Sequence, residues 1–162
     1  MDAETRDAAN ERDIETVTPL YRAPDPSDHG FIFNSLMLSL RKAYTYIPED
    51  KFFPPVRRLV ARVAETAHVL VACDKDLPSF ILAYCIAEPV ALNDTDFTVH
   101  YAYTKPMFRR KGLQWELMRR LGHTRGVTLN VTLPTYRTKM MIRDRKPNRM
   151  ITIDPFFFAK WV

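Results

Sequence analysis

A basic loop in the second half of the chain contains the residue types of an anion-binding site. Residues 99–121 read as a strand, then Pro106, then three consecutive cations and a glycine that opens a helix; the cations are Arg109, Arg110 and Lys111, and the glycine is Gly112. The backbone N–H groups of a helix start, together with the positive end of the helix dipole, attract anions. Because glycine has no side chain to keep phosphate oxygens away from these amides, the loop predicts a pyrophosphate site.

Charge is distributed unevenly along the chain, whose net charge is +5. Residues 105–149 include thirteen basic and two acidic residues, and the remainder of the chain sums to −6. The basic half is expected to meet an anion, and nucleic acid, a phosphorylated cofactor and an acidic protein partner all satisfy that expectation. Because no aromatic residues alternate with the cations of 137–149, base stacking is not indicated there.

Length and composition limit the class of protein. The chain has 162 residues, 46% of them apolar and 27% charged, which is typical of one compact domain and excludes a wholly disordered chain. We expect residues 1–16 to form a flexible acidic leader and residues 17–162 to form a single domain. The longest uncharged stretches, 31–40 and 77–87, are too short to cross a bilayer, and residues 1–13 lack the apolar core of a secretory signal. A cytoplasmic location without a membrane partner is therefore predicted.

The cysteine pattern indicates neither a metal site nor a disulfide framework. Cys73 and Cys85 lie outside any CxxC motif and outside any Cys/His cluster. We expect both to be buried, reduced thiols, and we predict no metal ligands.

The pattern of apolar residues and turn residues predicts the elements that position the loop. The expected order is a strand at 17–22, helices at 31–44 and 56–66, strands at 68–73, 80–87 and 97–103, a helix at 112–121, a strand at 127–133, a helix at 136–145 and a strand at 150–159. The three consecutive strands predict an antiparallel meander. Pro48, Pro54 and Pro55 are expected to break the chain between the first two helices.

The basic loop resembles the acetyl-CoA loop of the GNAT superfamily of N-acetyltransferases, which reads Arg/Gln-x-x-Gly-x-Gly/Ala between a strand and a helix. Residues 109–114 match this pattern, with Pro106 and Phe108 where the family commonly has proline and tyrosine. The order of elements is also similar. The resemblance implies an α/β (α+β) GNAT-like acyl-CoA N-acyltransferase fold. Its mixed, mainly antiparallel central sheet is flanked by helices and splays after the fourth strand.

The chain departs from the family pattern at two places. Gln114 stands where the family usually has a small residue. The family's helix tyrosine, often the acid that protonates the leaving thiolate, aligns near Ile142, and Tyr136 is the nearest replacement.

The resemblance implies acetyl-CoA as co-substrate and direct attack of an amine on its thioester. Main-chain groups of Ala102, Tyr103 and Thr104 would then bind the pantetheine arm. The pyrophosphate would be bound by loop amides, which belong to Arg109, Arg110, Lys111, Gly112, Leu113 and Gln114. The candidate catalytic groups are the bases His100 and Glu88 and the acid Tyr136, with a strand N–H stabilising the oxyanion.

Three classes of function stay open. The first is an N-acetyltransferase acting on a small-molecule amine, a protein lysine or a protein N-terminus. The second is a degenerate acetyltransferase fold that serves as a binding or structural protein, of the kind that bacteriophages carry, which Gln114 and the missing tyrosine favour. The third is a nucleic-acid-binding protein, favoured by the charge of 105–149 alone. The edge strand 150–159 can pair within one chain or with a second copy, so a homodimer also stays open.

Overall fold

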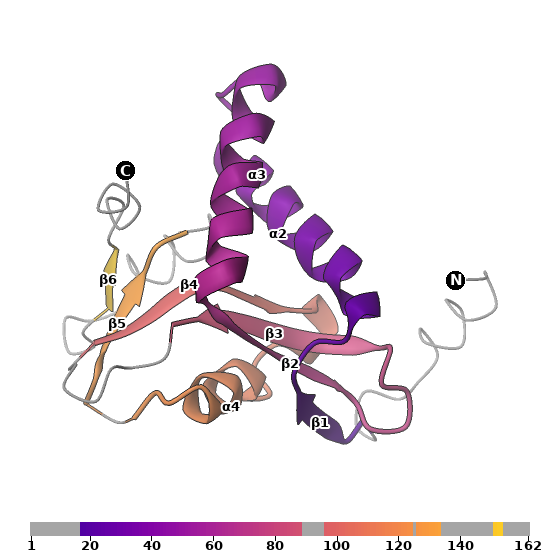
Figure 1. Cartoon of the computed structure of the whole chain (residues 1–162). Coiled ribbons are helices and arrows are strands. Elements are labelled where there is room, and N and C mark those ends of the chain that lie inside the picture. The colour runs from indigo at the N-terminus through magenta and orange to yellow at the C-terminus, as the bar shows by residue number, and fades with distance from the viewer. Residues whose placement is uncertain (1–16, 89–95, 125, 134–150, 154–162) are drawn as a thin grey trace.

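A mixed β-sheet forms the centre of the protein. The computed structural model describes residues 17–88, 96–124, 126–133 and 151–153, and within them six strands pair in sequential order, β1 to β6 (Figure 1). The strands are β1 (Pro19–Arg22), β2 (His68–Asp74), β3 (Ile81–Ala87), β4 (Asp96–Thr104), β5 (Thr128–Val131) and β6 (Ile151–Ile153). Strands β1 to β4 pair antiparallel with one another, whereas β5 pairs in parallel with both β4 and β6. The predicted mixed, mainly antiparallel sheet is confirmed.

The predicted meander is also confirmed, since β2, β3 and β4 follow one another along the chain and pair antiparallel. Strand β1 extends the meander by pairing with β2. Strand β6 occupies three residues of the predicted strand 150–159, and the rest of that segment lies outside the described residues, as does the predicted helix 136–145. The predicted leader 1–16 lies outside them as well.

Helices cover both faces of the sheet. Helices α2 (His29–Ala43) and α3 (Glu49–Thr66) rise from one face, and α4 (Leu113–Arg120) lies against the other (Figure 1). Two short 3-10 helices, η1 (Pro26–Asp28) and η2 (Pro106–Phe108), precede α2 and α4. Among the described helices, none is long and apolar enough to cross a membrane.

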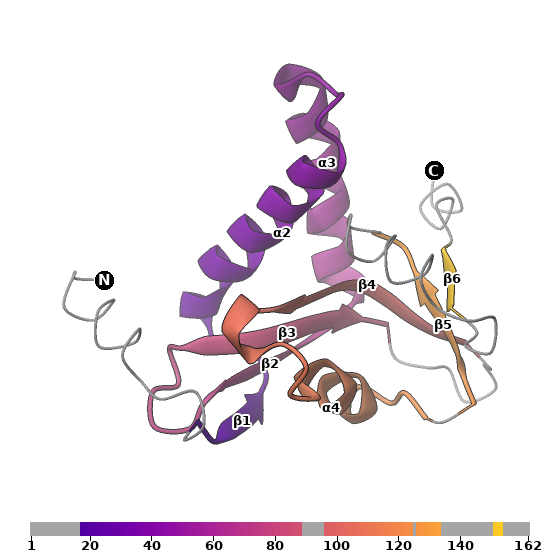
Figure 2. The same cartoon turned by 180° about the vertical axis from the view of Figure 1, so that it is seen from behind.

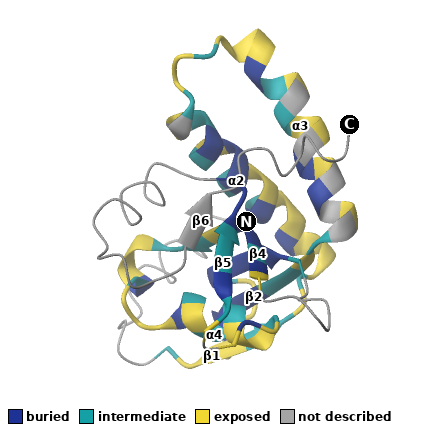
Figure 3. Cartoon of the chain, turned by 90° about the vertical axis from the view of Figure 1, so that its left-hand side faces the viewer, coloured by how far each residue is buried: buried dark blue, intermediate teal, exposed yellow. Residues whose placement is uncertain are grey.

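Helix α3 begins seven residues earlier than expected, at Glu49, so the prediction that all three prolines break the chain was wrong. Pro48 is the N-cap, but Pro54 and Pro55 lie inside the helix. Prolines at these positions leave the carbonyls of residues 50 and 51 without their helical N–H donors. These two residues are exposed, so water can satisfy both carbonyls. Exposed residues colour much of the end of α3 that lies away from the sheet (Figure 3).

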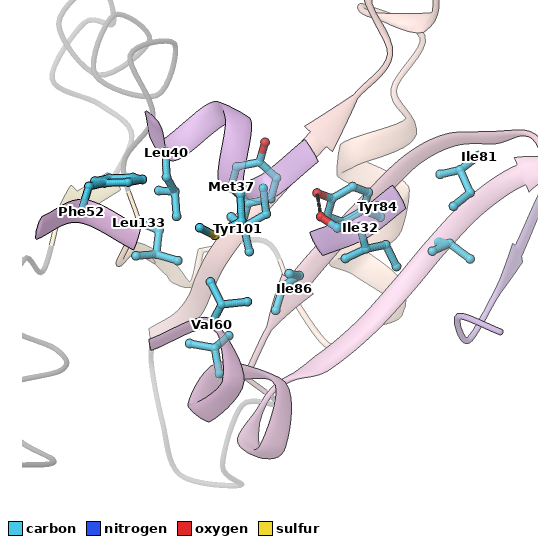
Figure 4. Packing of buried hydrophobic residues seen from close by; sticks show 13 residues of the cluster. Ile32, Met37, Leu40, Phe52, Val60, Ile81, Tyr84, Ile86, Tyr101 and Leu133 are labelled. Atoms are coloured by element: carbon cyan, nitrogen blue, oxygen red, sulfur yellow. Dashed lines mark hydrogen bonds between the residues drawn. The ribbon is translucent and has the colours of Figure 1, made fainter. Parts of the chain in front are cut away.

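The face beneath α2 and α3 contains the larger apolar cluster. Its buried members include Ile32, Leu36, Met37 and Leu40 of α2, Phe52, Val60 and Val63 of α3, and Val71, Tyr84, Ile86 and Tyr101 of the sheet (Figure 4). Two tyrosine hydroxyls fasten α2 to this face. The Tyr84 hydroxyl donates to the Ile32 carbonyl (3.0 Å), and the Tyr101 hydroxyl donates to Ser39 Oγ (2.6 Å).

The opposite face is covered by α4. Leu113 and Leu117 project from this helix into a cluster that includes Leu82, Cys85 and Phe97 of the sheet. Cys73 and Cys85 are both buried and free, as predicted, and burial raises the pKa of the Cys85 thiol to about 12. At neutral pH this thiol therefore stays protonated and unreactive.

Leucine truncation tests the packing of α4. Leu117 is fully buried, so Leu117→Ala removes buried methyl groups and leaves a cavity. We expect the free energy of unfolding to fall by about 2–5 kcal/mol in urea denaturation. The matched control is Leu38→Ala in α2, where the leucine is 64% exposed. There we expect a change within about 0.5 kcal/mol. Equal losses in the two variants would contradict the packing described for α4.

Candidate functional site

Strand β4 pairs with β5 along its first half and then leaves it. The parallel ladder begins at Asp96 and ends at Val99, and one further hydrogen bond runs from the Thr132 N–H to the Val99 carbonyl. Strand β4 continues to Thr104, and the two strands run apart (Figure 2). The second half of β4 therefore has one edge without a partner strand among the described residues, which we call the open edge.

The register of β4 determines which main-chain groups lie on the open edge. The Lys105 N–H donates to the Leu82 carbonyl at 2.9 Å, so the main-chain groups of Lys105 face β3. These groups alternate in direction along a strand. Those of Tyr103 therefore also face β3, whereas those of Ala102 and Thr104 face the open edge. Of the three residues expected to bind pantetheine through the main chain, two have main-chain groups on that edge.

A β-bulge separates the two halves of β4. Opposite β3, Ile86 pairs with Tyr101 and Ala87 pairs with Val99, so His100 is the extra residue. A bulge twists the strand locally and changes the direction of the side chain it carries. His100 thus lies where β4 parts from β5.

The bulge brings together both predicted bases. His100 Nε2 lies 3.3 Å from Glu88 Oε1, and His100 Nδ1 lies 2.8 Å from Thr132 Oγ1. His100 is completely buried, but the Glu88 side chain is 27% exposed. A second molecule can therefore reach the Glu88 carboxyl group, but not the His100 ring. Thr132 was not predicted, because a threonine just after a strand is too common to mark a site.

Burial sets the charges of this polar chain. It lowers the pKa of His100 to about 4 and raises the pKa of the Glu88 carboxyl above its usual value. The imidazole is therefore neutral at neutral pH and has one N–H. With Glu88 ionised, that N–H is placed on Nε2, where it donates to the carboxylate, and Nδ1 accepts from the Thr132 hydroxyl.

The basic loop, residues 109–112, contains two residues with a left-handed backbone, and we call this segment the nest. Arg110 has φ 66° and Gly112, the N-cap of α4, has φ 77°. Alternation of such residues with ordinary ones turns successive N–H groups toward a common point. A Cβ added at Gly112 would meet nothing within 4 Å, so the left-handed backbone rather than crowding favours glycine here. The Arg109 Nε donates to the Thr104 carbonyl at 3.4 Å, which joins the loop to the open edge.

Gln114 fastens the start of α4 to the sheet. Its Nε2 donates to the carbonyls of Tyr84 (3.1 Å) and Tyr103 and lies 3.0 Å from Thr104 Oγ1. Its Oε1 is buried and has no hydrogen-bond partner among the described residues. The side chain thus points into the sheet. Its partners do not include the main-chain groups of Ala102 or Thr104, so it does not take up the groups at the open edge.

The described basic residues differ in their surroundings. Glu116 accepts hydrogen bonds from both Arg119 and Arg120, at 2.7–2.8 Å. The ammonium group of Lys105 lies 3.5 Å from the centroid of the Phe80 ring, and burial lowers its pKa to about 8. Some of the described basic side chains are therefore engaged within the chain. Tyr136, the predicted acid, lies outside the described residues.

No family model matches the sequence, and no curated protein does. Solved structures of GNAT-family acetyltransferases do match the fold. A protein from Staphylococcus aureus is 11% identical with a TM-score of 0.43, and the match covers 64% of each chain. The Escherichia coli protein YhbS, in complex with CoA, is 19% identical with a TM-score of 0.41, over 65% of this chain and 54% of that one. The PaiA N-acetyltransferase of Thermoplasma acidophilum, with coenzyme A, is 13% identical with a TM-score of 0.44, over 78% and 87%.

The mixed sheet, with helices on both faces and a fourth strand that parts from the fifth, agrees with the resemblance of the loop sequence. The chain is similar to these GNAT-family structures, with TM-scores of 0.41–0.44. The chain spans 64% and 54% of the length of the first two proteins named above. The ligands of those proteins are therefore not assigned to this chain by similarity.

The buried imidazole predicts a pH-dependent loss of stability. Folding lowers the His100 pKa from 6.5 to about 4, so the unfolded chain binds more protons between these values, and stability falls as the pH drops through this window. Compared with His100→Asn, which cannot titrate, the unaltered chain should lose about 3 kcal/mol more between pH 6.5 and pH 4. Denaturant unfolding at each pH measures this. The raised pKa of Glu88 makes both proteins more stable as the pH falls, so its effect cancels in the comparison. If the unfolding free energies of the two proteins changed in parallel with pH, the lowered pKa of His100 would be wrong.

Proposed function

We propose that this protein is an N-acetyltransferase that transfers an acetyl group from acetyl-CoA to a primary amine. The observation that carries the proposal is the junction between the open edge of β4 and the nest that precedes α4. Arg109 joins the two through the Thr104 carbonyl. A linear molecule with amide groups at one end and a pyrophosphate at the other matches this order of groups.

The donor groups suit each part of such a molecule. The main-chain groups of Ala102 and Thr104 can pair with the amides of pantetheine as a further strand would. The pyrophosphate fits the nest, where the N–H groups that begin α4 have no acceptor within the helix. Arg110 and Lys111, both exposed, add positive charge beside it.

Glu88 is the general base in this proposal. Acetyl-CoA, when bound, supplies an activated acetyl thioester. The Glu88 carboxylate accepts a proton from the attacking amine, and burial supports this role by raising the pKa of the carboxyl toward neutrality. His100 is buried and, because its pKa is low, too weakly basic to take that role at neutral pH. It acts instead as a positioning residue, since Thr132 holds its Nδ1 and its Nε2–H orients Glu88.

A second candidate is a protein that binds acetyl-CoA without turnover. Gln114 favours it, because its side chain is larger than the small residue of the GNAT pattern. Its inward orientation favours the enzyme instead, because the amide is bonded to carbonyls of Tyr84 and Tyr103 rather than to the groups at the open edge. Binding and turnover experiments together separate the two candidates.

Titration of acetyl-CoA tests the binding site. We expect a micromolar dissociation constant, or about −8 kcal/mol, by calorimetry, together with a higher melting temperature. Gly112→Glu should abolish both signals, because a carboxylate then faces the pyrophosphate and the backbone is strained.

The matched control for this titration is Gly122→Glu at the other end of α4. Gly122 also has a positive φ, 104°, and open space at its Cβ position. Backbone strain should therefore be similar in the two variants, whereas binding should survive in the control. Equal loss of binding in both would contradict the placement of the pyrophosphate, and absence of heat with the unaltered chain would refute cofactor binding.

Removal of the Glu88 carboxylate tests the chemistry. With polyamines, aminoglycosides and lysine peptides as acceptors, and release of the CoA thiol as the readout, Glu88→Gln should lower kcat about 10²- to 10⁴-fold. The dissociation constant for acetyl-CoA should not change. The acid limb of the kcat/KM profile should disappear, because the titrating base is gone.

The control for this experiment is Glu65→Gln, which alters an exposed glutamate of α3. It should leave kcat and the pH profile unchanged. A Glu88→Gln variant with full activity would exclude Glu88 as the base. Cofactor binding without turnover on any acceptor would favour the binding-protein candidate.

A further inference from the structure

An exposed indole belongs to the first turn of α4, the helix that the nest precedes. Trp115 is in the first turn of α4 and is 50% exposed. It follows the N-cap Gly112 by three residues, which is about 4.5 Å along the helix axis. Leu113 and Leu117 of the same helix are buried against the sheet, so Trp115 is the large apolar side chain that the start of α4 presents to solvent.

Two further rings support this indole from behind. The Trp115 and His123 rings meet edge to face, with centroids 5.0 Å apart. His123 in turn meets Phe97 at 5.2 Å, also edge to face, and Phe97 is completely buried. The indole is therefore held on one side by a stack of rings that reaches the core, while half of its surface stays accessible. A ring that is already oriented loses little conformational entropy when a flat ligand stacks on it.

The ring that supports Trp115 belongs to His123, a polar residue at a buried position. His123 is 7% exposed, and its Nδ1 is buried without a hydrogen-bond partner among the described residues. Burial lowers the pKa of His123, so the ring is held in its neutral form. A buried unpaired nitrogen is unfavourable, and phenylalanine would fill the same space without that cost. Departures of this kind are expected where a side chain serves a ligand site rather than the core.

We propose that Trp115 stacks on the adenine base of the CoA nucleotide, with His123 as the residue that positions the indole. This inference rests on the proposed function, because it places the pyrophosphate at the nest. One ribose separates the base from that pyrophosphate, and three residues of chain separate Trp115 from Gly112, the N-cap at the nest. Any nucleobase offers a flat face to an indole, and stacking of this kind is independent of base-edge recognition. The acetyl group is then bound near the bulge of β4, and the base at the start of α4.

A pair of ligands separates stacking from a general effect on the site. Acetyl-CoA carries the adenine nucleotide, and S-acetyl-4′-phosphopantetheine lacks it. Trp115→Ala should weaken acetyl-CoA binding about 5- to 100-fold and leave S-acetyl-4′-phosphopantetheine binding unchanged. Trp115→Phe, which keeps a flat ring, should recover most of the affinity. The matched control is Tyr46→Ala, where an aromatic side chain that is 76% exposed lies between α2 and α3. It should change neither affinity.

Indole fluorescence gives a second, independent readout. The chain has two tryptophans, so in a Trp161→Phe background the emission comes from Trp115. Titration with adenosine 3′,5′-bisphosphate should quench that emission, and S-acetyl-4′-phosphopantetheine should not. His123→Phe, which keeps a ring but removes Nδ1, tests the positioning role. It should lower the preference for acetyl-CoA over S-acetyl-4′-phosphopantetheine, whereas a purely structural role would change both affinities alike.

The outcomes are distinct. Loss confined to the nucleotide-bearing ligand, with quenching, supports the inference. Equal weakening of both ligands by Trp115→Ala, or an acetyl-CoA affinity that does not change, overturns the stacking role and leaves the proposed function intact. Absence of binding of either ligand to the unaltered chain overturns the proposed function and the inference together.

Discussion

The structure depends on how β4 pairs with its two neighbours, since β3 is antiparallel to it and β5 is parallel to it. Residues 99–104 of β4 pair antiparallel with β3, whereas β5 pairs in parallel with residues 96–99 alone. The bulge at His100 lies at the transition and changes which main-chain groups face each side. Without this separation, Ala102 and Thr104 would have their main-chain groups engaged in a ladder. The open edge and the polar chain of His100 both depend on it.

The open edge is useful because a second element is fixed against it. Helix α4 is held by burial of Leu113 and Leu117 and by the amide of Gln114, which bonds two carbonyls of adjacent strands. These contacts place the start of the helix beside the end of β4. Arg110 and Gly112 both have a left-handed backbone, which is unfavourable for the arginine. Such a conformation persists where the contacts around it hold the backbone in place.

Much of the framework could be predicted from the sequence. The strand meander and helices α2 and α4 could be predicted from the spacing of apolar residues and from turn residues, because this spacing follows the repeat of a helix or a strand. The start of α3 could not be predicted, since Pro54 and Pro55 normally end a helix. Local preference was overridden by burial of Phe52, Val60 and Val63, which anchors the helix on both sides of the prolines.

Residue types and their spacing along the chain were enough to predict the basic loop and its glycine, and the resemblance of that loop to the GNAT pattern made His100 and Glu88 candidate bases. What these two side chains contact depends on the tertiary structure. It placed Glu88, His100 and Thr132 in one hydrogen-bonded chain, although they come from three separate segments. It also turned Gln114 inward. Such contacts depend on strand register and burial, which result from interactions across the whole sheet. A local pattern of residues therefore does not predict these contacts.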